Sequence, residues 1–445
     1  MIKQCVSGLA ALLLIGSSGG ALGANFLVCP DGSGDYETIQ LAVDAAADGD
    51  VIELANGVFA GRGNKDINYL GKAVTIRSQS GNPDSCIIDV EGEFNQTAQR
   101  GFVFLSGEGG ESLLRDLTII NGVADGPCPA CEGAGVYSEH SSPTIINVKF
   151  IGNYALSGAG FTAVGGSPTI SGCAFVGNQG LEGAGIMIYD SSAAVIDHCI
   201  FYNNLASNQG GAIYAHTESS PIVTNCTIVG NWSAMGGGIR LWESDLTLEN
   251  SIIAFSDQGE AINIYGESQI EILYSDLYGN QAGDWTEPFE DQAEINGNLT
   301  VDPQFVDTSA ADYRLQDGSP CIDAGNPNSP HDPDGTIADM GAYFYDQTVG
   351  ISGPGHLPVA GFAAKNFPNP FNASTEIRFN LPQQMTVQIE FFDLLGRRLE
   401  SITLPDLPAG TQAYTWNAAT HPSGLYFYRL QAADYSLVNS CVLLK

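Results

Sequence analysis

The sequence predicts an all-β protein organised around a parallel β-helix, and three observations lead to that prediction. The stretch from Gly133 to Asn280 repeats itself with a period of roughly 25–27 residues, which is typical of a solenoid. Apolar residues alternate within each unit, as at Cys173 and Phe175, with the strand period of two. Glycines and Ser-Pro corners separate these strands, and no helix-period segment fits between them. Strands that stack on their counterparts one repeat later, all in one direction, form a β-helix whose coils each add about 4.8 Å.

Superposition of the units brings three kinds of residue into register. The aligned positions are occupied by the apolar residues Val136, Phe161, Ile186, Ile213, Ile239 and Ile262, by Asn153, Asn178, Asn204 and Asn231, and by Cys173, Cys199 and Cys226. The apolar column is expected to face the core. The asparagines are interpreted as a structural ladder, because Asn tolerates left-handed turns and its amide can bond to the next coil. The cysteines are compatible with disulfides between neighbouring coils and equally with stacked buried thiols.

The units that read Gly-Gly-Ala-Ile and Asn-Cys-Thr-Ile resemble the right-handed β-helix family that includes pectate lyases and many bacterial surface proteins. The resemblance covers roughly Ala24 to Asp346 and implies a right-handed coil. It indicates no particular activity, because enzymes, adhesins and passive spacers share this fold.

Length and charge limit the possible partners. The chain has 445 residues, which suggests two or three domains, and 50 acidic against 16 basic residues produce a formal net charge of −34. Nucleic acids and anionic membrane surfaces are excluded as partners, since both require a basic footprint. A polyanionic substrate is also disfavoured unless a cation bridges it to the protein.

Residues 1–24 have the pattern of a secretory signal peptide. Lys3 supplies the positive start, Leu9–Ile15 is an apolar run too short to span a bilayer, and small residues precede Ala24. Export is therefore expected, with no membrane span after the signal is removed. The Cys-Pro-Ala-Cys segment that ends at Cys131 lacks the second ligand pair of a zinc site, which leaves a local disulfide or two free thiols.

The domain at 25–346 is expected to begin with a capping helix. Apolar residues recur at helical spacing from Ile39 to Ala46, with Asp35 as the expected N-cap and Glu37 in the first turn. The preceding Gly-Ser-Gly-Asp-Tyr segment resembles the opening of pectin methylesterases, which marks the start of a β-helix rather than esterase chemistry. Strands within Asp50–Leu54, Ala73–Ile76 and Gly101–Leu105 are expected to form the early coils.

The repeat fades after Asn280. Gly283–Asn298 is predicted to be a loop, and Val301–Tyr345 resembles the closing segment of secreted bacterial β-helix proteins, so this second stretch is assigned to the C-terminal cap. Within it, Asp332, Asp334 and Asp339 are candidate Ca²⁺ ligands, although they lack the full EF-hand spacing. Residues 347–362, rich in Gly, Ser and Pro, are interpreted as a linker.

Residues 363–445 consist of alternating strands separated by turns, which predicts an Ig-like sandwich. The Pro-Asn-Pro-Phe-Asn motif that ends at Asn372, Asp393–Arg397, Ser423–Tyr428 and the terminal Val442–Lys445 resemble the C-terminal sorting domain of type IX secretion substrates. The resemblance implies that the type IX secretion machinery is a partner. It also implies that the protein reaches the medium or the cell surface of a Gram-negative-type bacterium.

Strand alternation predicts one outward face that carries candidate ligand-binding side chains. If the apolar column faces inward, its neighbours face water. This face then carries six candidate ligand-binding residues: Tyr189, Tyr214, His216, Arg240, Trp242 and Tyr265. Exposed rings suit sugar rings, whose C–H faces stack on aromatic surfaces. The alternative is that these aromatic residues reflect only the high strand propensity of aromatic side chains and bind no ligand. They would then be covered by a loop, for instance the one that contains Trp285.

Catalysis has weaker support in the sequence. A lyase needs a cationic group, for which Arg240 is a candidate, and a hydrolase needs two carboxylates about 5–9.5 Å apart. Asp190, Glu218 and Glu243 lie near enough in register to be candidates, whereas Asp197 and His198 are interpreted as a surface pair. The shortage of basic residues favours a carbohydrate-binding, adhesive or structural surface protein. The alternative is a polysaccharide lyase or glycoside hydrolase.

Overall fold

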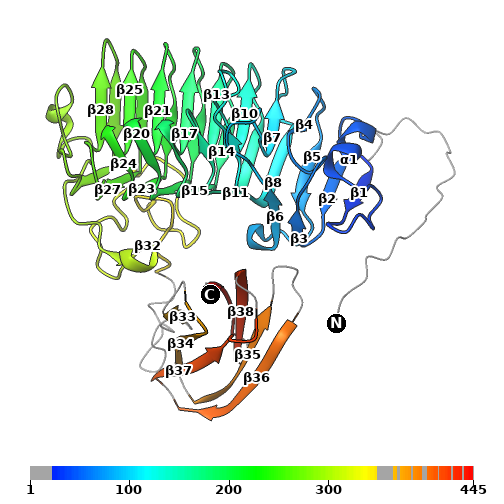
Figure 1. Ribbon diagram of the computed structural model, residues 1–445. Helices are drawn as coiled ribbons and strands as arrows, with labels where there is room; N and C mark the ends of the chain where they lie inside the picture. The colour runs from blue at the N-terminus through cyan, green and yellow to red at the C-terminus, as the bar shows by residue number, and fades with distance from the viewer. Residues whose placement is uncertain are drawn as a thin grey trace. The chain divides into compact units, whose positions relative to one another are not determined.

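The computed structural model describes residues 23–347 and, further on, 364–367, 371–381, 384–392, 398–408, 410–421, 424–432 and 435–443. The chain forms two compact units, Met1–Asp346 and Gln347–Lys445. The first unit is a parallel β-solenoid of about 10 turns (Figure 1). Residues 1–22 of the predicted signal peptide and 348–362 of the predicted linker lie outside the described residues.

The coils of the solenoid form three hydrogen-bonded parallel sheets. The largest contains two ladders that share two long strands, and these ladders are called sheets 1 and 2, while the other two sheets are called sheets 3 and 4. Sheet 1 contains β1 (Asn25–Val28), β2 (Val51–Leu54), β5 (Thr75–Ser78), β8 (Leu113–Ile120), β11 (Thr144–Ile151), β14 (Thr169–Ser171), β18 (Val195–Asp197), β22 (Ile222–Thr224), β26 (Leu246–Glu249) and β29 (Ile270–Leu273). Sheet 2 contains β3 (Gly57–Phe59), β6 (Cys86–Asp89), the second halves of β8 and β11, β15 (Ala174–Val176), β19 (Ile200–Tyr202), β23 (Thr227–Val229), β27 (Ile252–Ala254) and β30 (Asp276–Tyr278). Sheet 3 contains β9 (Val123–Ala124), β12 (Tyr154–Ala155), β16 (Gln179–Glu182), β20 (Leu205–Gln209) and β24 (Trp232–Met235). Sheet 4 contains β4 (Ile67–Asn68), β7 (Phe102–Phe104), β10 (Val136–Glu139), β13 (Phe161–Val164), β17 (Ile186–Tyr189), β21 (Ile213–His216), β25 (Ile239–Trp242) and β28 (Ile262–Tyr265).

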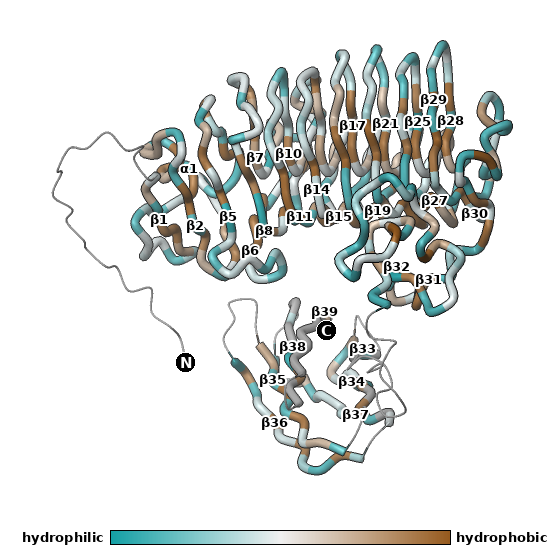
Figure 2. The backbone as a smooth tube through the Cα atoms, turned by 180° about the vertical axis from the view of Figure 1, so that it is seen from behind, coloured by the Kyte–Doolittle hydropathy of each residue, from teal (hydrophilic) through white to brown (hydrophobic). Residues whose placement is uncertain are grey.

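The predicted inward column is confirmed. Val136 pairs with Phe161, Phe161 with Ile186, and the column continues to Ile262, all without solvent exposure. On sheet 2, Phe150, Phe175 and Phe201 stack with centroid distances of 4.6 and 4.7 Å. Hydrophobic positions follow the strands and hydrophilic ones the tips of the turns (Figure 2). Each coil therefore buries its apolar side chains mainly against the coils before and after it.

The asparagine ladder is confirmed as well. Asn153, Asn178, Asn204 and Asn231 are fully buried at the turn between sheets 2 and 3. The Nδ2 of Asn178 donates to Oδ1 of Asn204 at 3.0 Å and to the carbonyl of Phe150 at 2.9 Å. This pattern repeats from coil to coil and satisfies backbone groups that the turn leaves unpaired.

The cysteines fall into two classes. Cys173, Cys199 and Cys226 are buried free thiols, and the Sγ of Cys199 accepts the N–H of Cys173 at 3.4 Å. The ladder is thus one of thiols and not of disulfides between coils. Cys128 and Cys131 form a local disulfide, which decides between the two possibilities left by the sequence.

The N-terminal capping helix is present, but its predicted N-cap is wrong. Helix α1 spans Ile39–Ala45, and the Oγ1 of Thr38 accepts the N–H of Leu41. Thr38 is extended and directly precedes the first helical residue, which is the geometry of an N-cap. Asp35 instead accepts the N–H of Leu27 at 2.8 Å, three residues too early to cap the helix.

The segment Gly283–Asn298 is a loop of turns and bends, as predicted, but it also takes the capping role predicted for Val301–Tyr345. It contains the 3-10 helix η2 (Glu290–Gln292) and inserts Phe289, fully buried, into the solenoid core. The N–H of Ile272 on β29 donates to Oε1 of Gln292, so this segment caps the last coil.

The segment Val301–Tyr345, predicted to be the cap, packs instead on the outer side of sheet 2. It contains β31 (Phe305–Asp307), the 3-10 helix η3 (Thr308–Ala310) and β32 (Asp312–Leu315). Phe305 and Tyr313 form one cluster with Val229 and Ile252. The physical reason is that sheet 2 is apolar on its outer side as well, and this side needs a cover.

The second unit is a β-sandwich whose two antiparallel sheets share one apolar core. Its strands are β33 (Ala364–Phe367), β34 (Ser374–Leu381), β35 (Met385–Phe392), β36 (Arg398–Leu407), β37 (Gly410–Asn417), β38 (Gly424–Ala432) and β39 (Tyr435–Leu443). At the centre of the core, Trp416 stacks on Phe391 with 4.2 Å between ring centroids. Within the described residues, no helix has the length and apolar character needed to cross a membrane.

Candidate ligand-binding face on sheet 4

Two columns of side chains project outward from sheet 4, in the register that the sequence predicts. The first column contains Tyr137, Thr162, Met187, Tyr214, Arg240 and Asn263. The second contains Glu139, Val164, Tyr189, His216, Trp242 and Tyr265. The backbone thus brings the six predicted ligand-binding residues onto one face.

The predicted exposure of the first column is wrong. Tyr214 is only 3% and Arg240 only 5% exposed, and the Nε of Arg240 donates to Oε1 of Gln209 at 3.1 Å. The turn between sheets 3 and 4 covers these side chains. Gly210, with φ of 62°, sits so close to Tyr214 that an added Cβ would lie 2.7 Å from the Cβ of Tyr214. A glycine at this position of each coil lets the turn backbone lie directly on the column.

The aromatic residues of the second column remain accessible to solvent. Tyr189 and His216 are half-buried and stack in parallel, with ring centroids 4.9 Å apart. Trp242 is 41% and Tyr265 57% exposed, and their rings meet edge to face at 5.4 Å. We call these four residues the aromatic ridge. They stand on four successive coils, and the two centroid distances are close to one inter-strand spacing.

The aromatic ridge is not covered by the loop that contains Trp285. That indole packs against the end of the core, 6.2 Å from the ring of Phe289, while Trp242 and Tyr265 stay exposed. Burial lowers the pKa of His216 to about 4, so its imidazole is neutral at ordinary pH. The ridge therefore offers uncharged ring surfaces to solvent.

A polar cluster that sequence reasoning missed lies at the N-terminal end of the ridge. The hydroxyl of Tyr189 donates to Oε2 of Glu132 at 2.8 Å, and the guanidinium of Arg100 lies 4.5 Å from the ring centroid of Tyr137. Arg100 also donates to the carbonyl of Glu132 at 2.9 Å. Burial raises the pKa of Glu132, although the Tyr189 hydroxyl and Arg100 act in the opposite direction.

These residues lie outside the regular repeat, which explains why the pattern did not reveal them. Arg100 belongs to an irregular early coil, and Glu132 directly follows the Cys128–Cys131 disulfide in the Gly/Pro-rich insertion. The one sequence signal was that insertion itself, because it interrupts the chain immediately before the first regular coil.

The candidate catalytic carboxylates occupy exposed turns. Asp190 and Glu243 directly follow strands of sheet 4, and Glu218 is the second residue after β21; their φ values are 61°, 50° and 58°. The N–H of Glu218 donates to the carbonyl of Glu243 at 2.9 Å, so these two stand on neighbouring coils. Their place in left-handed turns accounts for them structurally, and a catalytic role for them or for the buried Arg240 stays a prediction.

The predicted calcium ligands are engaged with backbone groups. Asp332 accepts the N–H of Asp339 at 2.9 Å, Asp334 accepts that of Thr336 at 3.1 Å, and Asp339 accepts that of Asp323 at 2.7 Å. Burial raises the pKa of Asp339 to about 6. Among the described residues, only Cys128, Cys131 and Glu132 bring three potential ligand atoms within 4.8 Å of one another, and both cysteines are in the disulfide. Calcium binding stays a prediction.

Asp197 and His198 form a surface pair as predicted, with 2.8 Å between Oδ2 and Nδ1. The hydrogen bond that His198 donates to the carboxylate of Asp197 raises the pKa of His198. His198 also lines a cavity of about 400 Å³ together with Asp332 and Asp339. This pair thus lies on a different side of the coil from the aromatic ridge, since Asp197 ends a strand of sheet 1.

Comparison with known families agrees with both units. Residues 134–300 match the model of the right handed beta helix region, and residues 365–443 match that of the secretion system C-terminal sorting domain. No curated protein sequence matches the chain.

Solved structures with similarity include two pectin methylesterases and a lyase. The pectin methylesterase from carrot has a TM-score of 0.32 and 15% identity, covering 64% of this chain and 90% of that one. A PL6 family alginate lyase has a TM-score of 0.28 and 15% identity, and the match covers 62% of this chain and 40% of the lyase chain. The pectin methylesterase from Aspergillus niger has a TM-score of 0.24 and 11% identity, and the match covers 66% of this chain and 95% of the esterase chain. At these TM-scores the similarity says nothing about the activity of this chain.

Proposed function

We propose that this secreted right-handed β-helix protein, which carries a C-terminal sorting domain for type IX secretion, binds an extracellular polysaccharide through its aromatic ridge. The observation that supports the proposal is the ridge itself. Four ring side chains stand on four successive coils, and the last two, Trp242 and Tyr265, are 41% and 57% exposed. Large exposed rings in a row are uncommon unless they contact a partner.

The geometry favours a glycan that lies along the solenoid axis. The ring centroids of Tyr189 and His216 lie 4.9 Å apart and those of Trp242 and Tyr265 lie 5.4 Å apart. Alternate coils are about 10 Å apart, which is comparable to the length of a disaccharide. Asp190, Glu218 and Glu243 lie in the turns directly beyond the ridge, where carboxylates can accept hydrogen bonds from sugar hydroxyls. With a net charge of −34 the chain repels polyanions, so a neutral glycan fits this face best.

Replacement of Trp242 by alanine is expected to weaken binding without harming the fold. The indole is 41% exposed and its loss removes stacking surface but little core contact, so the free energy of unfolding should change by less than about 1 kcal/mol. Retention in affinity gels that contain neutral polysaccharides measures binding. Leu205→Ala is the matched control, because Leu205 is also 41% exposed but lies on sheet 3. Equal retention of both variants, or a marked loss of stability in Trp242→Ala alone, would contradict the proposal.

Binding at the ridge is also expected to be insensitive to pH and salt. The pKa of His216 is lowered to about 4, so the imidazole keeps the same neutral state from about pH 5.5 to about pH 8. Ring stacking, unlike a contact between charges, is not screened by ions. Retention measured across this pH range and up to about 0.5 M NaCl should therefore stay constant. A strong decline with salt would instead indicate a charge-driven contact.

A second candidate function is cleavage of a polysaccharide, and one observation favours it. Glu132 bonds to Tyr189 at one end of the ridge, and burial raises the pKa of its carboxyl, which is the direction that general acid catalysis requires. Unsaturated products at about 235 nm and new reducing ends would reveal turnover, which Glu132→Gln should abolish while Glu218→Gln and Glu243→Gln keep it. If instead the turn carboxylates are the essential ones, Glu132 is not the acid.

A further inference from the structure

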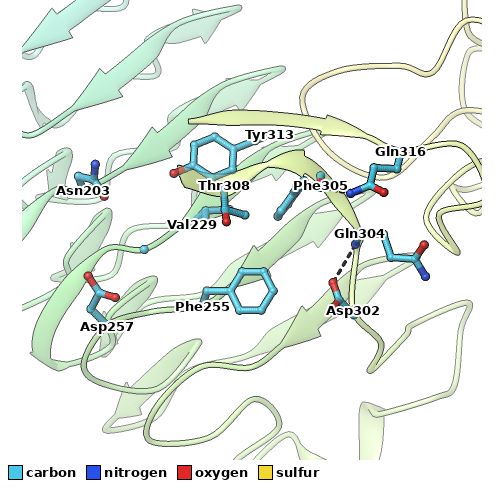
Figure 3. A pocket seen from close by; sticks show the side chains of 11 residues that line it. Asn203, Val229, Phe255, Asp257, Asp302, Gln304, Phe305, Thr308, Tyr313 and Gln316 are labelled. Carbon is cyan, nitrogen blue, oxygen red and sulfur yellow. Dashed lines mark hydrogen bonds between the residues drawn. The ribbon is translucent and has the colours of Figure 1, made fainter. Parts of the chain in front are cut away.

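A cavity of about 490 Å³ lies between the coils and the segment that covers sheet 2 (Figure 3). On the solenoid side it is lined by Val229 at the end of β23 and by Phe255 and Asp257, which follow β27. On the other side stand Phe305, Thr308 and Tyr313, from β31, η3 and β32. Its volume is in the range of sites for small molecules.

The wall formed by the covering segment is held in a fixed conformation. The N–H of Gln316 donates to the carbonyl of Gln304 at 2.9 Å, and its side chain donates to the carbonyl of Phe305 at 2.6 Å. The N–H of Gln304 in turn donates to Oδ1 of Asp302 at 2.9 Å, the bond drawn in Figure 3. Phe305 and Tyr313 meet edge to face with centroids 5.5 Å apart. The cavity is thus an open pocket bordered on one side by the coils and on the other by the hydrogen-bonded covering segment.

The chemistry of the lining is selective. Three aromatic residues are combined with carboxylate, amide and hydroxyl groups, and no Lys or Arg is among them. Two carboxylates, of Asp257 and Asp302, make the cavity acidic, so phosphates and uronic acids are disfavoured. A neutral ligand with many hydroxyl groups satisfies both the ring surfaces and the polar groups.

Two side chains are available to recognise such a ligand. Within residues 23–347, neither the carboxylate of Asp257 nor the hydroxyl of Tyr313 has a hydrogen-bond partner in the protein. Burial, Tyr202 and Asp257 raise the pKa of Tyr313 to about 12, so its hydroxyl keeps the proton that it can donate. Asp257 supplies the complementary acceptor, as Figure 3 shows it at the same end of the cavity as the Tyr313 hydroxyl.

We propose that this cavity is a second carbohydrate-binding site, which takes a neutral sugar of one or two rings, packs it against Phe255 and bonds its hydroxyls to Asp257 and Tyr313. The site belongs to sheet 2 and the covering segment, whereas the aromatic ridge belongs to sheet 4. The proposal therefore does not depend on the function of the ridge. It assigns a role to the segment 302–316, which goes beyond shielding apolar surface.

Calorimetric titration of the full-length protein with cellobiose, lactose and chitobiose tests the proposal, with galacturonic acid as the acidic comparison. We expect at least one neutral disaccharide to bind and galacturonic acid not to bind. Tyr313→Phe and Asp257→Asn keep the shape of the cavity and should each weaken binding about tenfold, which is the loss of one or two hydrogen bonds. Thr308→Trp, at an exposed position that faces the cavity, should block it and abolish binding while the melting temperature is maintained.

The matched control is Leu205→Ala, an exposed position on sheet 3 that lines neither the cavity nor the ridge and should leave these titrations unchanged. Loss of binding in Trp242→Ala but not in Thr308→Trp would place the sugar on the ridge and overturn the cavity proposal. Absence of heat with every neutral disaccharide, or equal affinity for galacturonic acid, would overturn it as well. If the proposed binding of polysaccharide by the ridge is wrong, the result is different: Trp242→Ala is retained in the polysaccharide gels as strongly as the wild type.

Discussion

Asn204→Ala is expected to lower the free energy of unfolding of the solenoid by about 3–5 kcal/mol. Asn204 is fully buried, and its Nδ2 donates to the carbonyl of Phe175 and to Oδ1 of Asn231, both at 2.9 Å. Its Oδ1 accepts the N–H and the Nδ2 of Asn178, both at 3.0 Å. Alanine removes these four buried bonds and leaves the N–H of Asn178 without its acceptor, whereas Nδ2 of Asn178 and Oδ1 of Asn231 each keep one other bond. Each buried polar group that loses its partner costs about 1–3 kcal/mol, partly offset by relaxation.

Urea unfolding followed by circular dichroism measures this loss, and Asn208→Ala is the control. Asn208 is exposed and makes a single 3.3 Å bond to Glu182, so its replacement should change stability by no more than about 0.5 kcal/mol. Asn204→Asp is a sharper variant, since it keeps the size of the side chain but removes both donated bonds. Stabilities of Asn204→Ala and Asn204→Asp equal to that of the control would show that the ladder contributes nothing.

Asp276→Asn is expected to stabilise the protein above neutral pH. Asp276 on β30 is fully buried, where Oδ1 accepts the N–H of Val301 at 3.1 Å and Oδ2 lies 3.6 Å from the thiol of Cys321. Burial, together with the nearby Asp284 and Asp302, raises the pKa of its carboxyl from 3.8 to about 7. The folded state therefore favours the protonated form, which the amide of Asn resembles in charge and shape.

The sign of the pH dependence follows from that shift. Below about pH 4 the carboxyl is protonated in both the folded and the unfolded chain, and no penalty arises. As the pH rises towards 7 the unfolded chain releases the proton and the folded chain does not, so stability falls. Above about pH 7 the full penalty is present, on the order of 4 kcal/mol from about 1.4 kcal/mol per pKa unit. Asp276→Asn removes this contribution.

Melting temperatures of the wild type and Asp276→Asn at about pH 4.5 and about pH 8 test the expectation. The advantage of the variant should be small at the lower pH and grow towards the higher one. Asp291→Asn, an exposed change of the same charge in η2, should show no such trend. A variant that is less stable than the wild type at the higher pH would mean that the fold requires the ionised carboxylate.

Sequence by itself determined the solenoid and its register. The repeat placed Val136, Phe161 and Ile186 in one buried column and Asn178 and Asn204 in one ladder, as the structure confirms. This succeeds because a coil of a solenoid packs chiefly on the coils before and after it, so an alignment of repeats is already a list of tertiary contacts. The second unit was recognisable for a different reason, since its motifs match one family over residues 365–443.

Only the tertiary structure decided which outward side chains reach solvent. Tyr214 and Tyr265 both point away from the core, yet the first is 3% and the second 57% exposed. Alternation along a strand determines the direction of a side chain, whereas its exposure depends on what else the chain lays over it. Here the cover is the turn backbone around Gly210, which approaches Tyr214 because a glycine with positive φ has no Cβ in the way.

The polar cluster around Glu132 and the cavity beside sheet 2 also became visible only in the tertiary structure. Arg100 and Glu132 are 32 residues apart outside the repeat, and the thiol of Cys321 reaches Asp276 over 45 residues. The covering segment brings Tyr313 beside Phe255 and Asp257, although nothing in its own sequence specifies the side of the coil on which it lies. Periodicity carries information only between equivalent positions of neighbouring coils. Contacts made by the irregular segments depend on apolar surface that the coils leave uncovered, and that surface exists only once the chain has folded.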